Sequence, residues 1–303
     1  MVSMANELKY VEYETLDNGT IARITLNRAR SRNAQNRGLL VELGNCFLRA
    51  EADDDVRVVI LCGAGPIFSS GHDLGSSASI AERTTGDPGF HGSYALNGGR
   101  RSGAEARMLQ EWHYFFENTL RWRNLRKITI AQVHGAVYAA GLMLMWACDL
   151  IVAAEDTVFA DVVGTRLGMC GVEYFAHPWE FGPRKTKQLM LTGDAIDAEE
   201  AYALGMVSKI FPLDQLPDRT LEFARRIAQL PTITALLIKE SVNQSVDNMG
   251  FHNALQACFS IHQLNHSHWA QIHEDKFSNA RPEDGVVPWR EAPSVAVARK
   301  DAI

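Results

Sequence analysis

The sequence lacks an apolar run long enough to cross a membrane, and residues 1–10 carry both charges without an apolar core. A membrane-spanning helix needs about 20 predominantly apolar residues, and a secretory signal peptide needs an apolar segment of its own. We therefore expect a cytoplasmic protein without membrane contact.

Positive charge is also scarce. The 303 residues include 30 Lys and Arg against 36 Asp and Glu, which gives a formal net charge of −6. Proteins that bind nucleic acid usually carry an excess of basic residues, so nucleic acid is not expected as a partner. The charge does not exclude an anionic small molecule, because local N–H groups and a few basic side chains can bind one.

Cysteine is too sparse for a disulfide framework. The five cysteines are odd in number and have no metal-like spacing, so we expect reduced thiols. The remaining composition, 46% hydrophobic and 22% charged, is ordinary for a globular protein of one large domain or a domain with an appendage. The cysteines are Cys46, Cys62, Cys148, Cys170 and Cys258.

Strand-like and helix-like hydrophobic patterns alternate along residues 11–154. The alternation indicates right-handed crossovers and an α/β layered core. Strands are predicted at 11–15 and 21–26, joined as a hairpin, and at 56–62, 128–133 and 150–154. Helices are predicted at 37–52, 104–122 and 141–147.

Other segments depart from this alternation. Residues 75–104 are polar, rich in Gly and Ser, and without periodicity, which predicts a surface loop or a lid. After Pro183 the pattern is helical except for a strand-like run at 207–211. We therefore predict an α/β core at 1–205, a helical region at 206–279 and a flexible or wrapping tail at 280–303. The later helices are predicted at 185–191, 198–204, 216–230, 232–247 and 251–269.

Two glycine-rich segments, 63–74 and 134–150, each follow a predicted strand and place small residues where the backbone must turn. A backbone N–H can reach a ligand oxygen only where no bulky side chain blocks it. Together the segments could present two N–H groups to one carbonyl oxygen, an oxyanion hole that stabilises an enolate or a tetrahedral anion. The second segment also opens a helix, whose dipole favours an anion. The alternative for each is an ordinary strand-to-helix turn.

An ordered series of motifs runs through residues 10–275. It begins with Leu26-Asn27-Arg28, Asn33-Ala34 and Phe68-Ser69-Ser70-Gly71-His72-Asp73-Leu74, and continues with Gly135, Gly141 and Cys148-Asp149. It closes with Leu191-Thr192-Gly193-Asp194, Ala201, Gly205-Met206-Val207 and Ser208-Lys209-Ile210-Phe211-Pro212. By the order of these motifs the chain resembles the crotonase superfamily, the enoyl-CoA hydratase/isomerase family.

The resemblance implies an α/β fold with a spiral of ββα units, followed by C-terminal helices that build trimers, often paired into hexamers. It implies an acyl-CoA thioester as ligand, so coenzyme A enters with the substrate and no separate cofactor is expected. By motif, the N–H groups of Ser70 and Ala140 would hold the thioester oxygen. The nucleotide and pantetheine path would be lined by Arg28, Ser69, Gly71, His72, Asp73, Leu74 and Gly141. Lys276 is the candidate to meet the CoA phosphates, and a solvated surface lysine is the alternative.

The chain departs from the family where hydratases carry two glutamates, which activate water as a general acid–base pair. The first would fall at Met143 and the second at about Val163, and neither side chain ionises. We expect weak turnover as an ordinary hydratase, because an absent acid–base group removes about 10²–10⁴-fold per step.

Three nearby groups could replace the missing pair. Glu173 is the first choice, near a helix start that faces the reacting carbon; the alternative is a glutamate that caps that helix. Asp161 would serve if the strand register turned it inward, and is otherwise exposed or structural. His72 could donate a proton, or pack beside the polar end of the ligand.

Histidines cluster late in the chain. His262 and His266 lie one helical turn apart and could bind a metal. No carboxylate with helical spacing completes a set on that face, so we expect these residues and His268 to be interface or surface histidines, and no metal site. The aromatic run at 112–116 could close over an acyl chain, but its helical spacing favours the core.

The sequence thus predicts an acyl-CoA-binding enzyme of the hydratase/isomerase type that stabilises a thioester enolate in lipid or small-acid catabolism. One alternative is another reaction on the same scaffold, namely isomerisation, decarboxylation, dehalogenation or thioester hydrolysis. The other is a protein that binds acyl-CoA without catalysis.

Overall fold

The computed structural model describes residues 8–85, 93–99, 101 and 103–275. Its main sheet has six strands in the order β1-β2-β3-β4-β6-β9, and only the β1–β2 pair is antiparallel. The predicted hairpin is confirmed, because β1 and β2 are consecutive and pair antiparallel. Asp17 and Asn18 both adopt positive φ in the turn that joins them. The strands are β1 (Val11–Leu16), β2 (Ile21–Leu26), β3 (Val58–Gly63), β4 (Ile128–Val133), β6 (Leu150–Ala154) and β9 (Lys209–Phe211).

A second sheet of three short strands was missed by the sequence analysis. It consists of β5 (Ala136–Tyr138), β7 (Val158–Ala160) and β8 (Ile196–Asp197). Strands of two or three residues are too short to show a hydrophobic period, which is why the sequence did not reveal them. From β4 to β7 the strands alternate between the two sheets, because the chain passes from β4 to β5 and from β6 to β7, as expected for ββα units.

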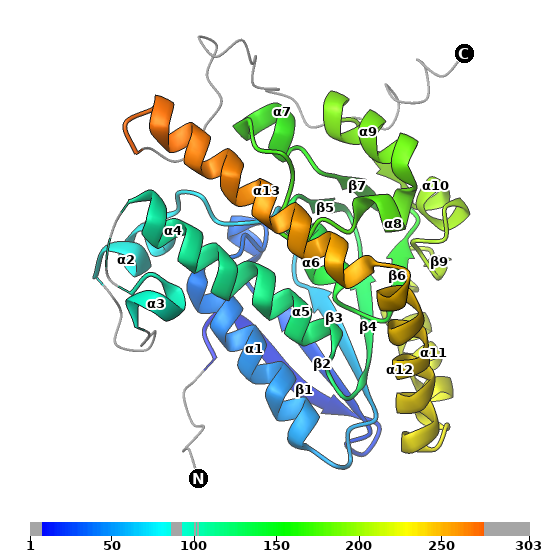
Figure 1. The fold of residues 1–303 in the computed structure, drawn as a ribbon. Helices are drawn as coiled ribbons and strands as arrows, with labels where there is room; N and C mark the ends of the chain where they lie inside the picture. Colours follow the sequence, from blue (N-terminus) through cyan, green and yellow to red (C-terminus); the bar gives the residue numbers. More distant parts are fainter. Residues whose placement is uncertain (1–7, 86–92, 100, 102, 276–303) are drawn as a thin grey trace.

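Helices cover both faces of the main sheet (Figure 1). On one face lies α1 (Arg37–Ala52), whose buried side includes Leu39, Leu43 and Phe47 and whose first turn is capped by the Asn36 side chain. The other face is covered by α11 (Leu216–Ala228), which packs through Leu216 and Ala224. Residues 206–228 therefore contribute to the main sheet and its cover, and the division predicted at 205 remains a prediction.

One long helical stretch runs beside α1 in three parts: α4 (Ala104–Gln110), a π-helical segment (Glu111–Glu117) and α5 (Asn118–Arg123). The last helix, α13 (Phe251–Ile272), runs alongside this stretch and contacts α4 (Figure 1). This contact brings residues near 111 and near 262 together.

Two helices lie in the described part of residues 75–104, and residues 86–92, 100 and 102 lie outside the described residues. Helix α2 (Ser77–Thr85) buries Ser79 and Glu82, and α3 (Tyr94–Asn97) buries Asn97. The prediction of a loop is therefore wrong for these two segments, because contacts with distant elements stabilise helices that have no strong period of their own. The alternative of a lid stays a prediction.

The predicted helices of the last third are confirmed, and three short ones had not been predicted. The predicted helices are α9 (Pro183–Thr192), α10 (Ala198–Ala203), α11, α12 (Thr232–Asn248) and α13. The additional ones are a 3-10 turn (Ala29–Ser31), α7 (Val163–Leu167) and α8 (His177–Phe181). Helix α6 (Ala140–Trp146) agrees with the prediction at 141–147. Lys276 and the predicted tail at 280–303 lie outside the described residues.

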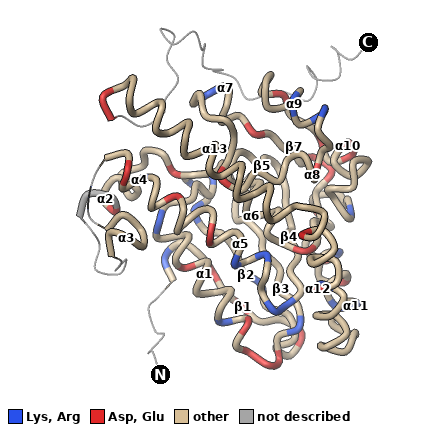
Figure 2. The backbone as a smooth tube through the Cα atoms, in the orientation of Figure 1, with Lys and Arg blue, Asp and Glu red and all other residues tan. Residues whose placement is uncertain are grey.

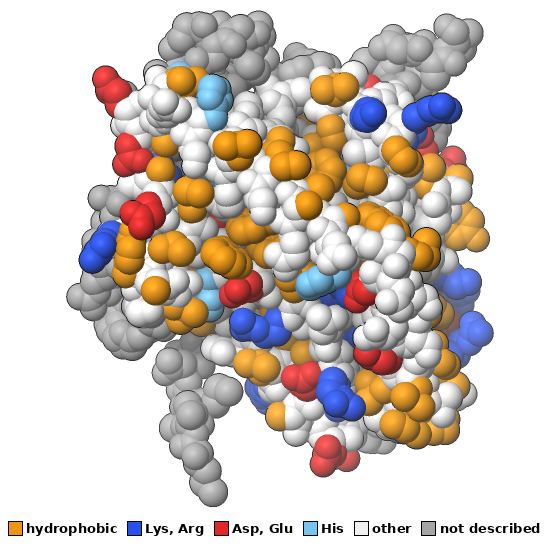
Figure 3. Space-filling model, viewed as in Figure 1, with side chains coloured by type: hydrophobic (Ala, Val, Ile, Leu, Met, Phe, Trp, Pro, Cys, Tyr) orange, Lys and Arg blue, Asp and Glu red, His pale blue; other side chains and the backbone are white. Residues whose placement is uncertain are grey.

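The described surface bears both charges, and apolar side chains are exposed on α12. Along the described backbone, Lys and Arg alternate with Asp and Glu without a continuous basic stripe (Figure 2). Among the described helices, none is long and apolar enough to cross a membrane. Hydrophobic side chains gather at the lower right of Figure 3, where α12 lies, and Ile233, Leu237 and Val242 of this helix are each more than half exposed.

Candidate active site

The two glycine-rich bends lie against each other. The N–H of Ser69 donates to the carbonyl of Ala136 at 3.3 Å, and the N–H of Tyr138 donates to the carbonyl of Ser69 at 3.0 Å. A Cβ on Gly141 would lie 2.7 Å from the Ser69 carbonyl oxygen, and one on Gly71 would lie 3.1 Å from the Ala140 nitrogen. Both glycines are therefore needed for the close approach of the two bends.

The backbone N–H groups left without an acceptor differ from the predicted pair, Ser70 and Ala140. The N–H of Ser70 already donates to the carbonyl of Arg32 at 3.0 Å, so it cannot also hold a ligand oxygen. Among the described residues, the backbone N–H of His72 has no acceptor, and neither has that of Ala140, the first residue of α6. We therefore replace Ser70 by His72 as the partner of Ala140.

Backbone strain marks the second bend. Ala139 has φ 49° and ψ −122°, a conformation that L-residues rarely adopt, and its N–H donates to the carbonyl of Ala160 at 2.9 Å. Strain of this kind persists only where neighbouring structure fixes it, and it clusters at functional sites. Here the conformation of Ala139 turns the chain into α6, so that the next backbone N–H, that of Ala140, is the first N–H group of this helix.

A cavity of about 250 Å³ adjoins these bends. Its wall includes Ser70 and Ala139 from the bends, Phe115 from the π-helical segment and Val163 from α7. Met143, by contrast, is buried in the hydrophobic core and is not among the lining residues. The ionisable lining residues include His72, Glu82, Glu111, Glu173, His262 and His266.

Glu173 lies in this cavity as a buried carboxylate. It belongs to the loop before α8, so the alternative of a helix-capping glutamate does not apply. Its Oε2 is 3.0 Å from Nε2 of His72, whose ring stacks on Phe115 with 3.6 Å between ring centroids. Burial alone would raise the pKa of Glu173, but the charges of His72 and His262 and the hydrogen bond from His72 hold it below its usual value. The carboxylate is therefore ionised and shared by imidazoles.

Asp161 lies elsewhere, as the structural alternative required. Its carboxylate accepts hydrogen bonds from the N–H groups of Val163 at 2.9 Å and Val172 at 3.2 Å, and lies 3.0 Å from Nε2 of His177. It is buried and is not among the residues that line the cavity. We therefore assign it to holding the loop at 161–177, and not to catalysis.

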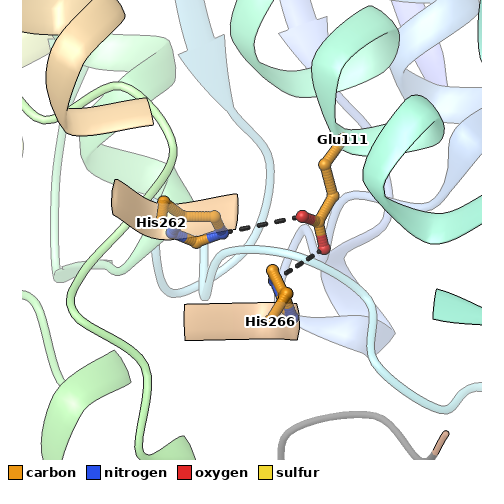
Figure 4. A group of neighbouring side chains, drawn as sticks. All are labelled: Glu111, His262 and His266. Atoms are coloured by element: carbon orange, nitrogen blue, oxygen red, sulfur yellow. Dashed lines mark ion pairs between the residues drawn. The ribbon is translucent and has the colours of Figure 1, made fainter. Parts of the chain in front are cut away.

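His262 and His266 of α13 are buried, which corrects the prediction of interface or surface residues for these two; His268 is exposed, as predicted. Glu111, from the π-helical segment, completes the cluster (Figure 4). Its Oε1 is 3.0 Å from Nε2 of His266, and its Oε2 is 3.6 Å from Nε2 of His262. Burial would raise the pKa of Glu111, but the hydrogen bonds and charges of the two histidines lower it to about 2.

Glu111 is the residue that the sequence analysis missed. The carboxylate that α13 lacks comes from another helix 151 positions earlier, so spacing on α13 could not reveal it. A signal was nevertheless present, because Glu111 shares the apolar face of its helix with Met108 and Phe115. A carboxylate in an apolar stripe needs a buried partner.

Most of the other predicted binding residues have structural contacts. The buried guanidinium of Arg28 lies 2.9 Å from the Asp73 carboxylate and does not line the cavity, whereas Asp73 and the half-exposed Leu74 do. The hydroxyl of Ser69 is buried and donates to the Asn33 carbonyl at 2.9 Å. Arg28 and Ser69 thus fix the first bend. The described cysteines are free thiols.

Comparison with known proteins gives one consistent result. A family model described as enoyl-CoA hydratase/isomerase matches residues 17–98 and 99–279. The chain is 67% identical over 294 residues to a Mycobacterium tuberculosis protein named "Putative enoyl-CoA hydratase EchA13", covering 97% of this chain and 92% of that protein.

Solved structures agree with this match. A probable enoyl-CoA hydratase from Mycobacterium smegmatis has a TM-score of 0.76 at 39% identity, covering 87% of this chain and 97% of that one. An enoyl-CoA hydratase/isomerase from Xanthobacter autotrophicus Py2 has a TM-score of 0.74 at 29% identity, covering 98% of both chains.

Proposed function

The chain belongs to the enoyl-CoA hydratase/isomerase family, and on that premise we propose that it binds an acyl-CoA thioester in the cavity and moves a proton on the acyl chain with Glu173 and His72. The observation that carries this proposal is the position of Glu173. It is a buried, ionised carboxylate that lies 3.0 Å from an imidazole and lines the same cavity as the two bends. A base in this place can take a proton only if an oxyanion is stabilised nearby.

The backbone supplies that stabilisation. The N–H groups of His72 and Ala140 would donate to the thioester oxygen, which gains negative charge when the enolate forms. Removing one such donor costs about 10²–10³-fold in rate in enzymes that use them. His72 therefore has two roles: its N–H binds the oxyanion, and its ring exchanges a proton with Glu173.

The reaction class follows from which groups ionise. Met143 and Val163, at the positions where the resemblance expects two glutamates, cannot transfer protons. We propose that Glu173 and His72 take over this work, and that hydration of a short enoyl-CoA is slower than in an enzyme that carries both glutamates. The names of the relatives, enoyl-CoA hydratases, support hydration as the reaction to test first.

The test uses the purified chain with a panel of enoyl-CoA and other acyl-CoA thioesters. Loss of the conjugated absorbance reports hydration, and mass spectrometry of products reports the other reactions. Glu173→Gln should lower the activity found about 10²–10⁴-fold, whereas Glu222→Gln, at an exposed position on α11, should leave it unchanged. Unchanged activity in Glu173→Gln would refute the assignment, and tight binding of every thioester without any product would favour a binding protein.

We also propose that the chain forms a trimer or a hexamer. The support is four exposed apolar residues on α12, which form two pairs with a spacing of four positions: Ile233 with Leu237, and Ile238 with Val242. Isolated exposed apolar residues are common, but a contiguous patch is typical of an interface. Sedimentation of the protein and of a Leu237→Glu variant measures this, and a monomeric wild type would contradict it.

A further inference from the structure

Glu111 and His266 have no role in the chemistry proposed above, and His262 enters it only through its charge near Glu173, although all three are buried and line the cavity. The two histidines lie one turn apart on α13, and Glu111 faces them from the π-helical segment (Figure 4). Their ligating atoms all lie within 4.8 Å of one another, with contacts of 3.0 Å and 3.6 Å from Glu111 to the two rings. Ligands at about 2.1 Å from a tetrahedral metal lie about 3.4 Å apart, so this spacing suits a shared ion.

The orientation of His262 provides an independent indication. Its Nδ1 is 3.0 Å from the carbonyl oxygen of Gly171, which can only accept, so Nδ1 carries the proton. Its Nε2 is buried, points toward Glu111 and Glu173, and has no hydrogen-bond partner among the described residues. Metal-binding histidines have this arrangement, in which a backbone carbonyl fixes one nitrogen and the lone pair of the other faces the ion.

The charge balance points the same way. Every ion pair that Glu111 and Glu173 make with described residues is to an imidazole; neither carboxylate pairs with a lysine or an arginine there. Arg37, Arg107 and Arg166 also line the cavity, but among the described residues none of them forms an ion pair with Glu111 or Glu173. Two buried carboxylates need positive charge in direct contact with them. A single divalent ion would supply this charge and leave the imidazoles neutral, as metal ligands must be.

We propose that Glu111, His262 and His266 bind one divalent transition-metal ion of the Zn²⁺ class, with an open coordination position toward the cavity. Two imidazoles and one carboxylate form a donor set used for catalytic zinc and for non-haem iron, in which the remaining positions hold water or substrate. Glu173 lies 3.8 Å from His262 through its Oε1 and is close enough to interact with a ligand in that open position. Protonated imidazoles are the competing explanation for the same contacts.

The test measures metal, not turnover. Apo protein, prepared with a chelator that is then removed, is titrated with Zn²⁺ by calorimetry and with Co²⁺ by visible absorption. We expect one ion per chain and the absorption of a low-coordinate Co²⁺ site. His266→Gln and Glu111→Gln should weaken binding at least about 100-fold, since even residues that only support metal ligands cost 10–100-fold.

The matched control is His268→Gln, because His268 is an exposed histidine on the same helix and should leave binding unchanged. Circular dichroism of each variant establishes that it folds. Failure of the wild type to bind one equivalent, or equal binding by His266→Gln and His268→Gln, would overturn the proposal. The site is independent of the proposed function: thioester activity without metal uptake would refute only the metal site, and metal uptake without thioester activity only the function.

Discussion

Two buried carboxylates of the segment 161–177, Asp161 and Glu173, each contact histidine, and they differ in their other surroundings. Asp161 accepts two backbone N–H groups as well as a bond from His177, and it lies outside the cavity. Glu173 lies in the cavity and receives no backbone donor from the described residues; it faces only the rings of His72 and His262. Both carboxylates are buried. They differ in their partners: Asp161 accepts backbone N–H groups and stabilises the fold, whereas Glu173 contacts only imidazoles and can exchange a proton with one.

The largest expected effect is the loss of activity when Glu173 or His72, which line the cavity, is replaced. His72→Gln and Glu173→Gln should each reduce kcat/KM about 10²–10⁴-fold, because each removes one half of a proton-transfer pair. The double variant should lose no more than the worse single one, since the two side chains act as a unit. Steady-state kinetics with the best thioester measures the cycle. If the two losses multiplied instead, the residues would act separately and the comparison would fail.

Replacing Asp161, the carboxylate that pairs with His177, should lower the stability of the protein. Asp161→Ala leaves His177 and two backbone N–H groups buried without an acceptor, so the free energy of unfolding should fall by about 3–5 kcal/mol. Urea denaturation measures the change, with Asp156→Ala in an exposed turn as the control. Glu173→Gln in the same experiment should cost clearly less than Asp161→Ala. An equal loss from both would remove the distinction drawn above.

A smaller effect is expected at the point where the two bends touch. Gly141→Ala places a Cβ 2.7 Å from the backbone oxygen of Ser69, so the bends must separate, at a cost of about 2 kcal/mol in stability. The same shift would move the Ala140 N–H and lower kcat about 10–100-fold. The control is Gly75→Ala, where an added Cβ meets nothing within 4 Å. Wild-type kinetics in Gly141→Ala would show that the contact does not position the donor.

The smallest effect concerns Asp73, which pairs with Arg28. Burial raises its pKa, but hydrogen bonds from Ser76 and Arg28 and the charge of Arg28 outweigh this and hold the pKa below its ordinary value of 3.8. A depressed folded-state pKa means that the pair stabilises the protein above pH 3.8 and that this contribution is lost as pH falls below it. Asp73→Asn should cost about 1 kcal/mol at pH 7 and flatten the acid side of the stability profile, measured by thermal unfolding. An unchanged acid profile would contradict this.

The sequence predicted the elements whose hydrophobic pattern is local. The strands β3 and β4 are apolar runs, and the buried face of α1 repeats at helical spacing, so both could be recognised without knowledge of their neighbours. The short strands β5, β7 and β8 could not, since two or three residues carry no period.

The site was predicted in part for the same reason. The two bends are local features, and the structure places Glu173 in the cavity beside them, while its catalytic role stays a prediction. Which N–H is available depends on Arg32, from another segment, and this changed the donor from Ser70 to His72. The cluster at Glu111 depends on how α13 packs against a helix far away in the chain, and the residue spacing on either helix does not predict that packing.

The π-helical turns at 111–117 have an evolutionary implication. A π segment contains one more residue than an α-helix of the same rise, and it commonly originates as a single inserted residue. Deleting one position between Trp112 and Phe116 would rotate everything before it by about 100° and carry the Glu111 carboxylate away from the imidazoles. A one-codon event in an ancestor could thus have created or erased this cluster without altering any strand of the scaffold.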